Sequence, residues 1–313
     1  MFVNIGDWQD ARARGVEVRW WSLWTPEEMA AFDTVAIAGS GFFGSVAHRA
    51  MERWCGDAVS FVPRPVEREL ERRGDRRRVV IRHFTGSHTG STSFWTDTED
   101  GRRCLHAVRG WLWENAPEGQ FWSCNSALLP YLGGGMPGRH CQPKLAGTNR
   151  LDGRTACTLV YSAKAQAQDE TAMRLFGVTK EEVRASREDE DIKQFVMRGA
   201  LRRAEFAGEY HVNLYDRRQA EMLREYLLAN GVADEAVVEY VDVGIGAIVK
   251  PAPGRQKIVV TPQQEAERRR RAKEADRARK RREREKERAA KAADGTLRGR
   301  GRPRKEDGAA ARP

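Results

Sequence analysis

The sequence lacks the signals of a membrane-spanning, disulfide-rich or zinc-binding protein. No apolar run approaches the roughly 18 residues that a spanning helix requires, and the start, MFVNIGDWQD, has no charged-then-apolar leader pattern. The five cysteines are odd in number, lie far apart and form no CxxC pair, and the six histidines form no HExxH motif. We therefore expect a cytoplasmic protein that has neither a disulfide framework nor a metal site.

Common catalytic motifs are missing as well. No G-x-x-x-x-G-K-[ST] sequence occurs, so nothing in the chain cradles a triphosphate in the manner of a P-loop. No DExx sequence follows a buried strand, and the serines of the polar loop at 86–93 lack a G-x-S-x-G elbow. We expect no ATP hydrolysis by this chain alone, and we assign no nucleophile triad.

Charge is distributed unevenly along the 313 residues. Residues 261–313 hold 20 Lys and Arg against 10 Asp and Glu, and subtracting these from the totals of 55 and 45 leaves 35 of each in residues 1–260. The body is thus formally neutral, and the whole excess of +10 lies in the C-terminal part. A basic tail on a neutral body indicates a polyanionic partner, for which nucleic acid is the first choice.

Short apolar runs alternate with amphipathic stretches over most of the chain. This alternation predicts an α/β fold with a mostly parallel sheet and flanking helices. Strands are expected at 33–38, 58–62, 77–84, 120–125, 157–163, 210–216 and 236–243, and helices at about 45–54, 104–114, 194–203 and 217–231. Beyond residue 262 large apolar side chains almost disappear, and acid-to-base pairs four residues apart predict a solvent-exposed helix.

The segment QFVMRGALRR, residues 194–203, carries the most specific pattern of the body. Gln194, Arg198 and Arg202 are four residues apart, so a helix would place them along one face. Arginine suits a developing phosphate charge because its planar fork is always ionised. The alternative interpretation is an ordinary amphipathic helix with surface arginines, since exposed charge is usually only solvated.

The surroundings of this segment resemble the second RecA-like lobe of superfamily 2 helicases. A Gly-Thr-Asn turn, Gly147, Thr148 and Asn149, precedes the strand-like run CTLVYSA, and the strand YHVNLYD follows the arginine segment. In that family a glycine-containing turn, motif V, contacts nucleic acid, and a Gln…Arg…Arg helix, motif VI, lends arginine fingers to a nucleotide held by the first lobe. The resemblance covers roughly residues 75–245. The family places the second arginine seven residues after the glutamine, whereas Arg202 is eight away, so Arg203 stays an alternative to it.

The resemblance implies half of a motor. Arg198 and Arg202 would stabilise charge on the γ-phosphate, with Gln194 as the third catalytic residue of the same helix, and Gly147, Thr148 and Asn149 would sense nucleic acid. ATP and Mg²⁺ would take part only if a first lobe completed the protein, and a companion chain would carry that lobe. The expected organisation is an N-terminal segment with the remnant of a first lobe (1–74), a RecA-like C-terminal lobe (75–255), a charged exposed helix (256–295) and a disordered tail (296–313).

A second glycine pattern offers a different cofactor. The run VAIAGSGFFGSVAHRA gives Gly39, Gly41 and Gly44 the G-x-G-x-x-G spacing between an expected strand and an expected helix. No Asp or Glu at the end of the next run, AVSFVPRP, could bind a ribose hydroxyl, although Arg64 could suit a 2′-phosphate. Two interpretations follow, a dinucleotide-binding enzyme and a tight turn without a ligand.

The C-terminal sequence GRGRPRK resembles an AT-hook. Its core is Arg300, Gly301, Arg302 and Pro303, and Arg304 and Lys305 follow directly. Glycine lets the backbone approach the floor of a narrow A·T-rich minor groove, whose negative potential attracts arginine. A generic Arg/Gly-rich tail is the alternative, and both interpretations give salt-sensitive DNA affinity.

Together these patterns predict a DNA-associated, nucleoid-located, helicase-like protein that is inactive as an ATPase by itself. The two rivals are a DNA-binding scaffold without enzymatic activity and the dinucleotide-dependent enzyme.

Overall fold

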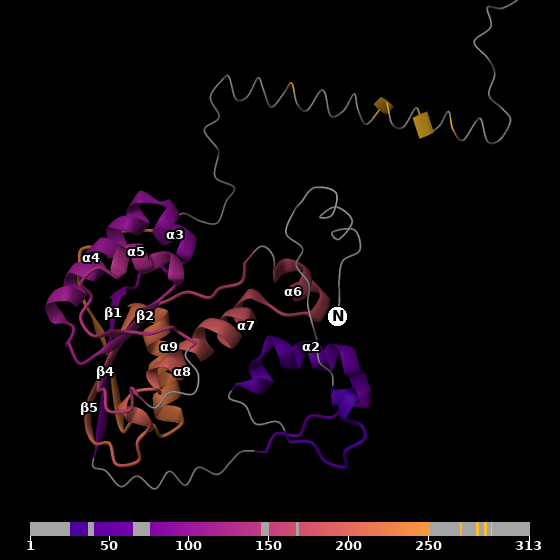
Figure 1. Ribbon diagram of the computed structural model, residues 1–313, viewed down its shortest axis with the longest axis horizontal. Coiled ribbons are helices and arrows are strands. Elements are labelled where there is room, and N and C mark those ends of the chain that lie inside the picture. The colour runs from indigo at the N-terminus through magenta and orange to yellow at the C-terminus, as the bar shows by residue number, and fades with distance from the viewer. Residues whose placement is uncertain are drawn as a thin grey trace, which may run out of the picture. The chain divides into compact units, whose positions relative to one another are not determined.

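Six strands pair side by side in one all-parallel sheet in the part of the chain that the structure describes. The structure is a computed structural model and describes residues 26–36, 41–64, 76–144, 150–166, 169–250 and, further on, 270, 280, 281, 285, 286 and 289. The strands are β1 (Arg77–Thr85), β2 (Phe121–Cys124), β3 (Arg139–His140), β4 (Ala156–Val160), β5 (Gly208–Asp216) and β6 (Glu235–Tyr240). Their order across the sheet is β3-β2-β4-β5-β1-β6 (Figure 1). The predicted α/β fold with a parallel sheet is confirmed.

Helices cover both faces of this sheet, which explains why its central strands are apolar on both sides. The α-helices are α2 (Val46–Cys55), α3 (Thr92–Asp97), α4 (Glu99–Asn115), α5 (Leu129–Leu132), α6 (Glu170–Phe176), α7 (Lys180–Arg184), α8 (Glu190–Val196) and α9 (Arg217–Ala229). A π-helical segment, η6 (Ala185–Asp189), joins α7 to α8, and short 3₁₀ turns are η1 (Pro26–Met29), η2 (Phe42–Gly44), η3 (Gly56–Ala58), η4 (Ser126–Leu128) and η7 (Ala200–Arg202). None of the described helices is long and apolar enough to cross a membrane.

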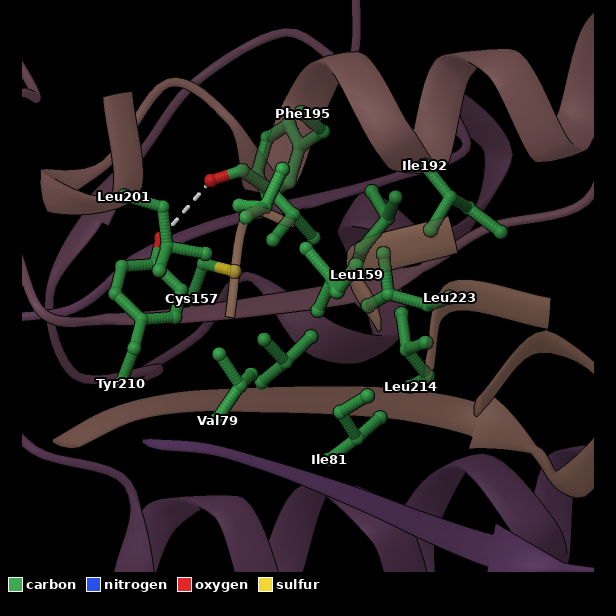
Figure 2. Packing of buried hydrophobic residues seen from close by; sticks show 14 of the residues in the cluster. Val79, Ile81, Cys157, Leu159, Ile192, Phe195, Leu201, Tyr210, Leu214 and Leu223 are labelled. Carbon is green, nitrogen blue, oxygen red and sulfur yellow. Dashed lines mark hydrogen bonds between the residues drawn. The ribbon is translucent and has the colours of Figure 1, made fainter. Parts of the chain in front are cut away.

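One apolar core lies between the sheet and helices α8 and α9. Val79 and Ile81 of β1 point into it, together with Leu159 of β4 and Phe195 and Leu223 of the helices (Figure 2). All five side chains are fully buried. Burying a side chain of this size contributes about 1.5–3 kcal/mol, so this face holds α8 and α9 firmly in register with the strands.

The opposite face carries a second core under α3, α4 and α5. Phe84 at the end of β1 and Trp122 of β2 pack there against Trp95, Leu105 and Leu112 of the helices. The two cores place α3 to α5 on one side of the sheet and α8 and α9 on the other (Figure 1).

Two expected strands and one expected helix are wrong. Residues 33–36 and 59–62 form no strand, so the described residues around the GSGFFG turn show a helix without flanking strands. The helix expected over 194–203 ends at Val196. Tertiary contacts end it: Val196 O accepts a hydrogen bond from Tyr210 Oη at 3.1 Å, and Ala200 N donates one to Arg154 O at 2.9 Å.

The chain divides into two units, Met1–Lys250 and Pro251–Pro313. In the second unit the six described residues are helical, and Arg281 Nε lies 3.0 Å from Glu285 Oε1, an i,i+4 pair. Most of the predicted charged helix and the whole predicted AT-hook lie outside the described residues.

Candidate functional site

The strand order gives two topological switch points at the carboxyl edge of the sheet. From β1 the chain leaves toward α3 and α4, whereas from the neighbouring β5 it leaves toward α9 on the opposite face. The neighbours β2 and β4 diverge in the same way, toward α5 and toward α8. Ligands of open parallel sheets bind where the connections of adjacent strands diverge in this manner. Polar side chains gather over both places.

Asp216, the last residue of β5, lies at the switch point between β5 and β1. Its carboxylate accepts from Gln219 N at 3.1 Å, which caps α9, and from Gly90 N at 3.2 Å, which belongs to the loop after β1. Its side chain is almost fully buried, and burial raises its pKa. Asp216 therefore ties the start of α9 to the loop that follows β1.

Two lysines from distant segments converge on the same loop. Lys164, four residues past β4, donates from Nζ to Thr89 Oγ1 at 2.6 Å and to Gly90 O at 2.5 Å. Lys250 donates to Ser91 Oγ at 2.6 Å. Burial lowers the pKa of both ammonium groups. The loop after β1 thus combines hydroxyl groups with two partly desolvated cations.

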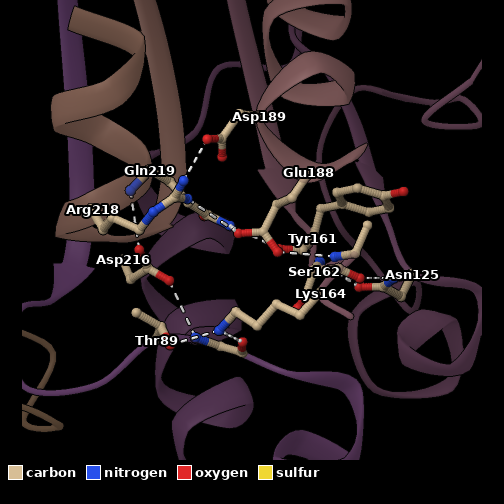
Figure 3. Close-up of polar contacts among 12 residues, drawn as sticks. Thr89, Asn125, Tyr161, Ser162, Lys164, Glu188, Asp189, Asp216, Arg218 and Gln219 are labelled. Carbon is tan, nitrogen blue, oxygen red and sulfur yellow. Dashed lines mark hydrogen bonds and ion pairs between the residues drawn. The ribbon is translucent and has the colours of Figure 1, made fainter. Parts of the chain in front are cut away.

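Asn125 lies at the second switch point, between β2 and β4. It follows β2 directly and makes a reciprocal pair with the backbone of Ser162, donating from Nδ2 to Ser162 O and accepting from Ser162 N, both at 2.8 Å. Figure 3 shows this clamp beside Lys164 and the acids of η6. The clamp replaces the sheet hydrogen bonds that end at Val160 and fixes the direction of the chain toward Lys164.

The acids Glu188 and Asp189 enter the cluster from η6, in the middle of the helical run α7–η6–α8. The sequence predicts that the acids of EDED, residues 188–191, begin the arginine helix. In the structure the helical run begins earlier, at Lys180, with a capping box between Thr179 and Glu182. Both acids are buried at 1% and 5% exposure. The π-bulge is a rare feature that occurs frequently at functional sites. Here it brings both acids into the cluster.

Arg218 and Gln219 of α9 balance these acids. Arg218 forms an ion pair with Asp189 and a longer one with Glu188 at 3.5 Å (Figure 3). Gln219 donates from Nε2 to Glu188 Oε1 at 3.0 Å and to Tyr161 O at 2.9 Å. Glu188 also accepts from Ala163 N at 2.9 Å. Buried charges persist only when they are paired in this way, so the cluster is a rigid frame around the ends of β4 and β5.

His88 joins the loop after β1 to the second core. Its Nδ1 lies 2.9 Å from Ile248 O, which can only accept, so Nδ1 carries the proton and Nε2 accepts from Tyr215 Oη at 2.8 Å. Burial lowers the pKa of His88, and the pKa values of His83 and His211 are lowered mainly for the same reason.

We predict that acidification destabilises the protein through these histidines. Since their folded pKa values lie below 6.5, the unfolded chain binds more protons in the window between those values and 6.5. The free energy of unfolding should therefore fall as the pH drops below about 6.5. Urea denaturation at several pH values between 5 and 7.5 measures this slope.

The matched variant is His88→Gln, which should flatten the slope. The raised pKa of Asp216 acts in the opposite direction, because a folded carboxyl that holds its proton more tightly gains stability on acidification. Asp216 contributes equally to the pH dependence of the wild type and of His88→Gln. Its contribution therefore cancels when the unfolding free energies of the two proteins are subtracted at each pH. An unchanged slope in the variant would contradict a neutral, buried His88.

The structure does not arrange Gln194, Arg198 and Arg202 as one helical row. Gln194 lies in α8 and donates to Glu190 Oε1 at 2.9 Å, while Arg198 follows the end of α8 and Arg202 belongs to η7. Arg198 is half-buried, burial lowers its pKa, and its Nη1 lies 3.5 Å from Gln142 O beyond edge strand β3.

Arg202 and Arg203 lie at the amino edge of the sheet, away from the polar cluster. Arg77, the first residue of β1, donates to Leu201 O and Arg203 O on either side of Arg202. Arg202 therefore does not share a site with the carboxyl-edge residues.

The Gly147-Thr148-Asn149 turn lies outside the described residues, but the segment that leads into it is placed. Lys144 Nζ lies 3.5 Å from Asp191 Oδ2, and Asp191 also accepts from Tyr161 Oη at 2.7 Å. Together with the contact between Gln142 and Arg198, this lays residues 142–144 along α8.

Of the second glycine pattern, Gly39 lies outside the described residues. Gly41 adopts φ +65°, a conformation that favours glycine, and Gly44 ends η2. A Cβ added to Gly41 would lie 2.9 Å from the Glu190 carboxylate. An acid at this distance and the absence of a strand in 33–36 do not match a pyrophosphate-binding turn.

Sequence reasoning missed the residues that form the cluster, namely Asn125, Lys164, Glu188, Asp189, Asp216 and Arg218. A usable signal was present, because polar residues follow the predicted strands directly in FWSCN, CTLVYSAK and YHVNLYDRR. Carboxyl ends of parallel strands meet at one edge, so the sequence does indicate a group of Asn125, Lys164, Asp216 and Arg218. Glu188 and Asp189 follow no strand, and this signal does not include them.

No group of three or more His, Cys, Asp or Glu side chains that could hold a metal ion occurs among the described residues. Comparison with known proteins gives no match: no protein-family model, no curated protein and no solved structure matches this chain.

Proposed function

We propose that the chain is the second RecA-like lobe of a helicase-like motor on DNA, with the nucleotide supplied by a first lobe on a companion chain. The observation that carries the proposal is the contact between α8 and residues 142–144. It brings the segment that leads into the Gly-Thr-Asn turn alongside Gln194 and Arg198. The helicase family couples nucleic acid to nucleotide through this pair of elements.

Arg198 is the arginine to which the proposal assigns the nucleotide. It is half-buried beside edge strand β3, and its guanidinium lies at the long distance of 3.5 Å from Gln142 O. A guanidinium in a partly dry site suits a phosphate charge that arrives from a partner. Arg202, at the amino edge, no longer shares this role.

The polar cluster supports the proposal by stiffening the lobe. Its hydrogen bonds join the ends of β1, β2, β4 and β5 through Asp216, Asn125 and Glu188. Energetic coupling between distant sites is carried by rigid elements and by hydrogen-bond and ion-pair networks. The cluster is a network of this kind.

The basic tail supplies the second DNA contact of the proposal. The core Arg300, Gly301, Arg302 and Pro303 would lie in an A·T-rich minor groove, with Arg304 and Lys305 on the phosphates. The non-enzymatic DNA-binding scaffold is the outcome that remains if the body has no contact with nucleic acid.

The experiment separates the body from the tail. In a full-length background with Arg300, Arg302 and Arg304 replaced by Ala, we expect the Thr148→Ala/Asn149→Ala variant to bind a labelled single strand about tenfold more weakly. Each lost phosphate or sugar contact at such a turn weakens binding and lowers its salt dependence. Fluorescence anisotropy at two salt concentrations measures both, and the chain alone should hydrolyse no ATP.

Arg103→Ala is the matched control, because it changes an exposed arginine of α4, on the opposite face of the sheet from α8, and should leave strand affinity unchanged. In the duplex arm, Arg302→Ala alone should weaken binding to an A·T-rich site more than to a G·C-rich one. If the tail variant already abolishes all strand binding, the scaffold interpretation replaces the motor.

A further inference from the structure

A separate pocket of about 520 Å³ opens beside the carboxyl ends of β1 and β6, on the face that carries α9. Its lining includes His83, Ser87, Arg217, Glu221 and Tyr240. This volume falls in the range of small-molecule sites, about 300–1,000 Å³. Among the described residues, neither Gln194 nor Arg198 of the proposed motor function lines it.

The aromatic wall of the pocket is held in place from three directions. The ring of Tyr240 lies 5.5 Å from that of His83, centroid to centroid, and its hydroxyl donates to Asp242 Oδ1 at 3.3 Å. A Cβ added to Gly246 would come within 2.9 Å of the same hydroxyl, so only glycine fits without a shift. Tyr240 nevertheless keeps 51% of its surface exposed. A fixed, exposed ring of this kind is a stacking platform.

The polar wall presents a cation and a carboxylate. Arg217 is two-thirds exposed, and its Nε lies 3.5 Å from Glu221 Oε1, one turn along α9. Arg217 can take a phosphate, while Glu221 can accept from an exocyclic amine of adenine or cytosine. The carboxylate disfavours a ligand that is anionic throughout, so inorganic phosphate alone fits poorly.

We infer that this pocket binds a nucleotide unit with an amino-bearing base, the base on Tyr240 and the phosphate on Arg217. The inference rests on the proposed function in taking nucleic acid as the partner. A free mononucleotide and a nucleotide within a single strand share this chemistry.

Calorimetric titration of the full chain tests the inference. We expect dAMP to bind more tightly than dTMP, deoxyadenosine or inorganic phosphate. Tyr240→Ala should weaken dAMP about tenfold because the stacked base loses its platform. Tyr131→Ala, a similarly accessible tyrosine on α5, should change nothing. Tyr240 is half exposed, so its removal leaves both cores intact.

A second pair of variants tests the phosphate end. Arg217→Ala should weaken the binding of dAMP about tenfold and leave the binding of deoxyadenosine unchanged. Arg224→Ala should leave the affinity for both ligands unchanged. Arg224 is the matched control because it lies on the same helix and pairs with the same acid, Glu221, at 3.3 Å. The inference is overturned if both arginine variants, or both tyrosine variants, lose the same amount of dAMP affinity. It is also overturned if dAMP does not bind at millimolar concentration.

Titration with (dA)₁₀ and (dT)₁₀ distinguishes the two sources. A preference for (dA)₁₀ that Tyr240→Ala removes assigns the pocket to a strand, and a response to dAMP alone assigns it to the free nucleotide. The Thr148→Ala/Asn149→Ala variant should keep its dAMP affinity. Failure of the pocket therefore leaves strand binding at the turn intact, and failure of the turn leaves dAMP binding intact.

Discussion

Replacing Arg77 by Ala should cost about 3–5 kcal/mol of unfolding free energy, the largest effect we expect from one side chain. Arg77 is 2% exposed, and its guanidinium donates to four carbonyl oxygens, those of Leu201, Arg203, Ala204 and Phe206. Without it these acceptors lose a charged donor inside the protein. Since domains are stable by only about 5–15 kcal/mol, the loss is a large share of the total.

The neighbouring arginine is the control for this prediction. Arg76 is exposed and pairs with Glu235 at 2.6 Å, a surface ion pair whose removal should cost less than about 1 kcal/mol. Arg77→Lys keeps the charge but cannot reproduce the planar fork, so it should fall between the two. Urea denaturation of the three variants measures the order. Equal stability of Arg76→Ala and Arg77→Ala would mean that Arg77 is not buried among these carbonyls.

Replacing Gly101 by Ala should destabilise the protein by about 3 kcal/mol, since the added methyl group overlaps backbone that cannot move away. A Cβ at Gly101 would lie 1.8 Å from Phe94 O and 2.8 Å from Trp95 Cα. This is the junction at which α3 packs against the start of α4, closed by Thr98, whose hydroxyl donates to Phe94 O and accepts from Gly101 N. The substitution forces α3 away from the second core.

Gly110→Ala on the same helix should change the free energy of unfolding in the opposite direction. Gly110 is exposed and a Cβ there meets no atom within 4 Å. Its replacement should stabilise the protein by about 0.5–1 kcal/mol, because alanine costs less backbone entropy in a helix. The same denaturation measurement gives both values. A destabilising Gly110→Ala, or a neutral Gly101→Ala, would show that the packing of α4 differs from this description.

The strands of the sheet were the most predictable part of the fold. Runs such as RRVVIRHF and YHVNLYD place buried apolar side chains on successive positions, Val79, Val80 and Ile81 in the first and Leu214 and Tyr215 in the second, as strands covered on both faces do. The same rule failed at the described residues 33–36 and at 58–62, which belong to short apolar runs followed by Gly39 and by Pro63. Such runs do not reveal whether a neighbouring strand exists to accept their hydrogen bonds.

The arginine segment shows why the site was harder to predict than the fold. Spacing alone favoured one helix through 194–203, but Gly199 packs against Tyr210, where a Cβ would lie 2.1 Å from the hydroxyl. That contact joins the segment after α8 to strand β5, and no helical or strand periodicity within 194–203 indicates it. Likewise the acids at 188 and 189 read as a helix start, although the helix begins a turn or more earlier, at Lys180.

The position of β1 has a consequence for synthesis. Arg77 pairs with Gly208 on one side, and Arg78 pairs with Glu235 on the other, so both neighbours of β1 leave the ribosome long after it does. At 5–20 residues per second this delay is on the order of 10 s. During that time an apolar strand has two open edges and is prone to aggregate. The need for chaperones during translation should thus increase when residues 86–235 are translated more slowly.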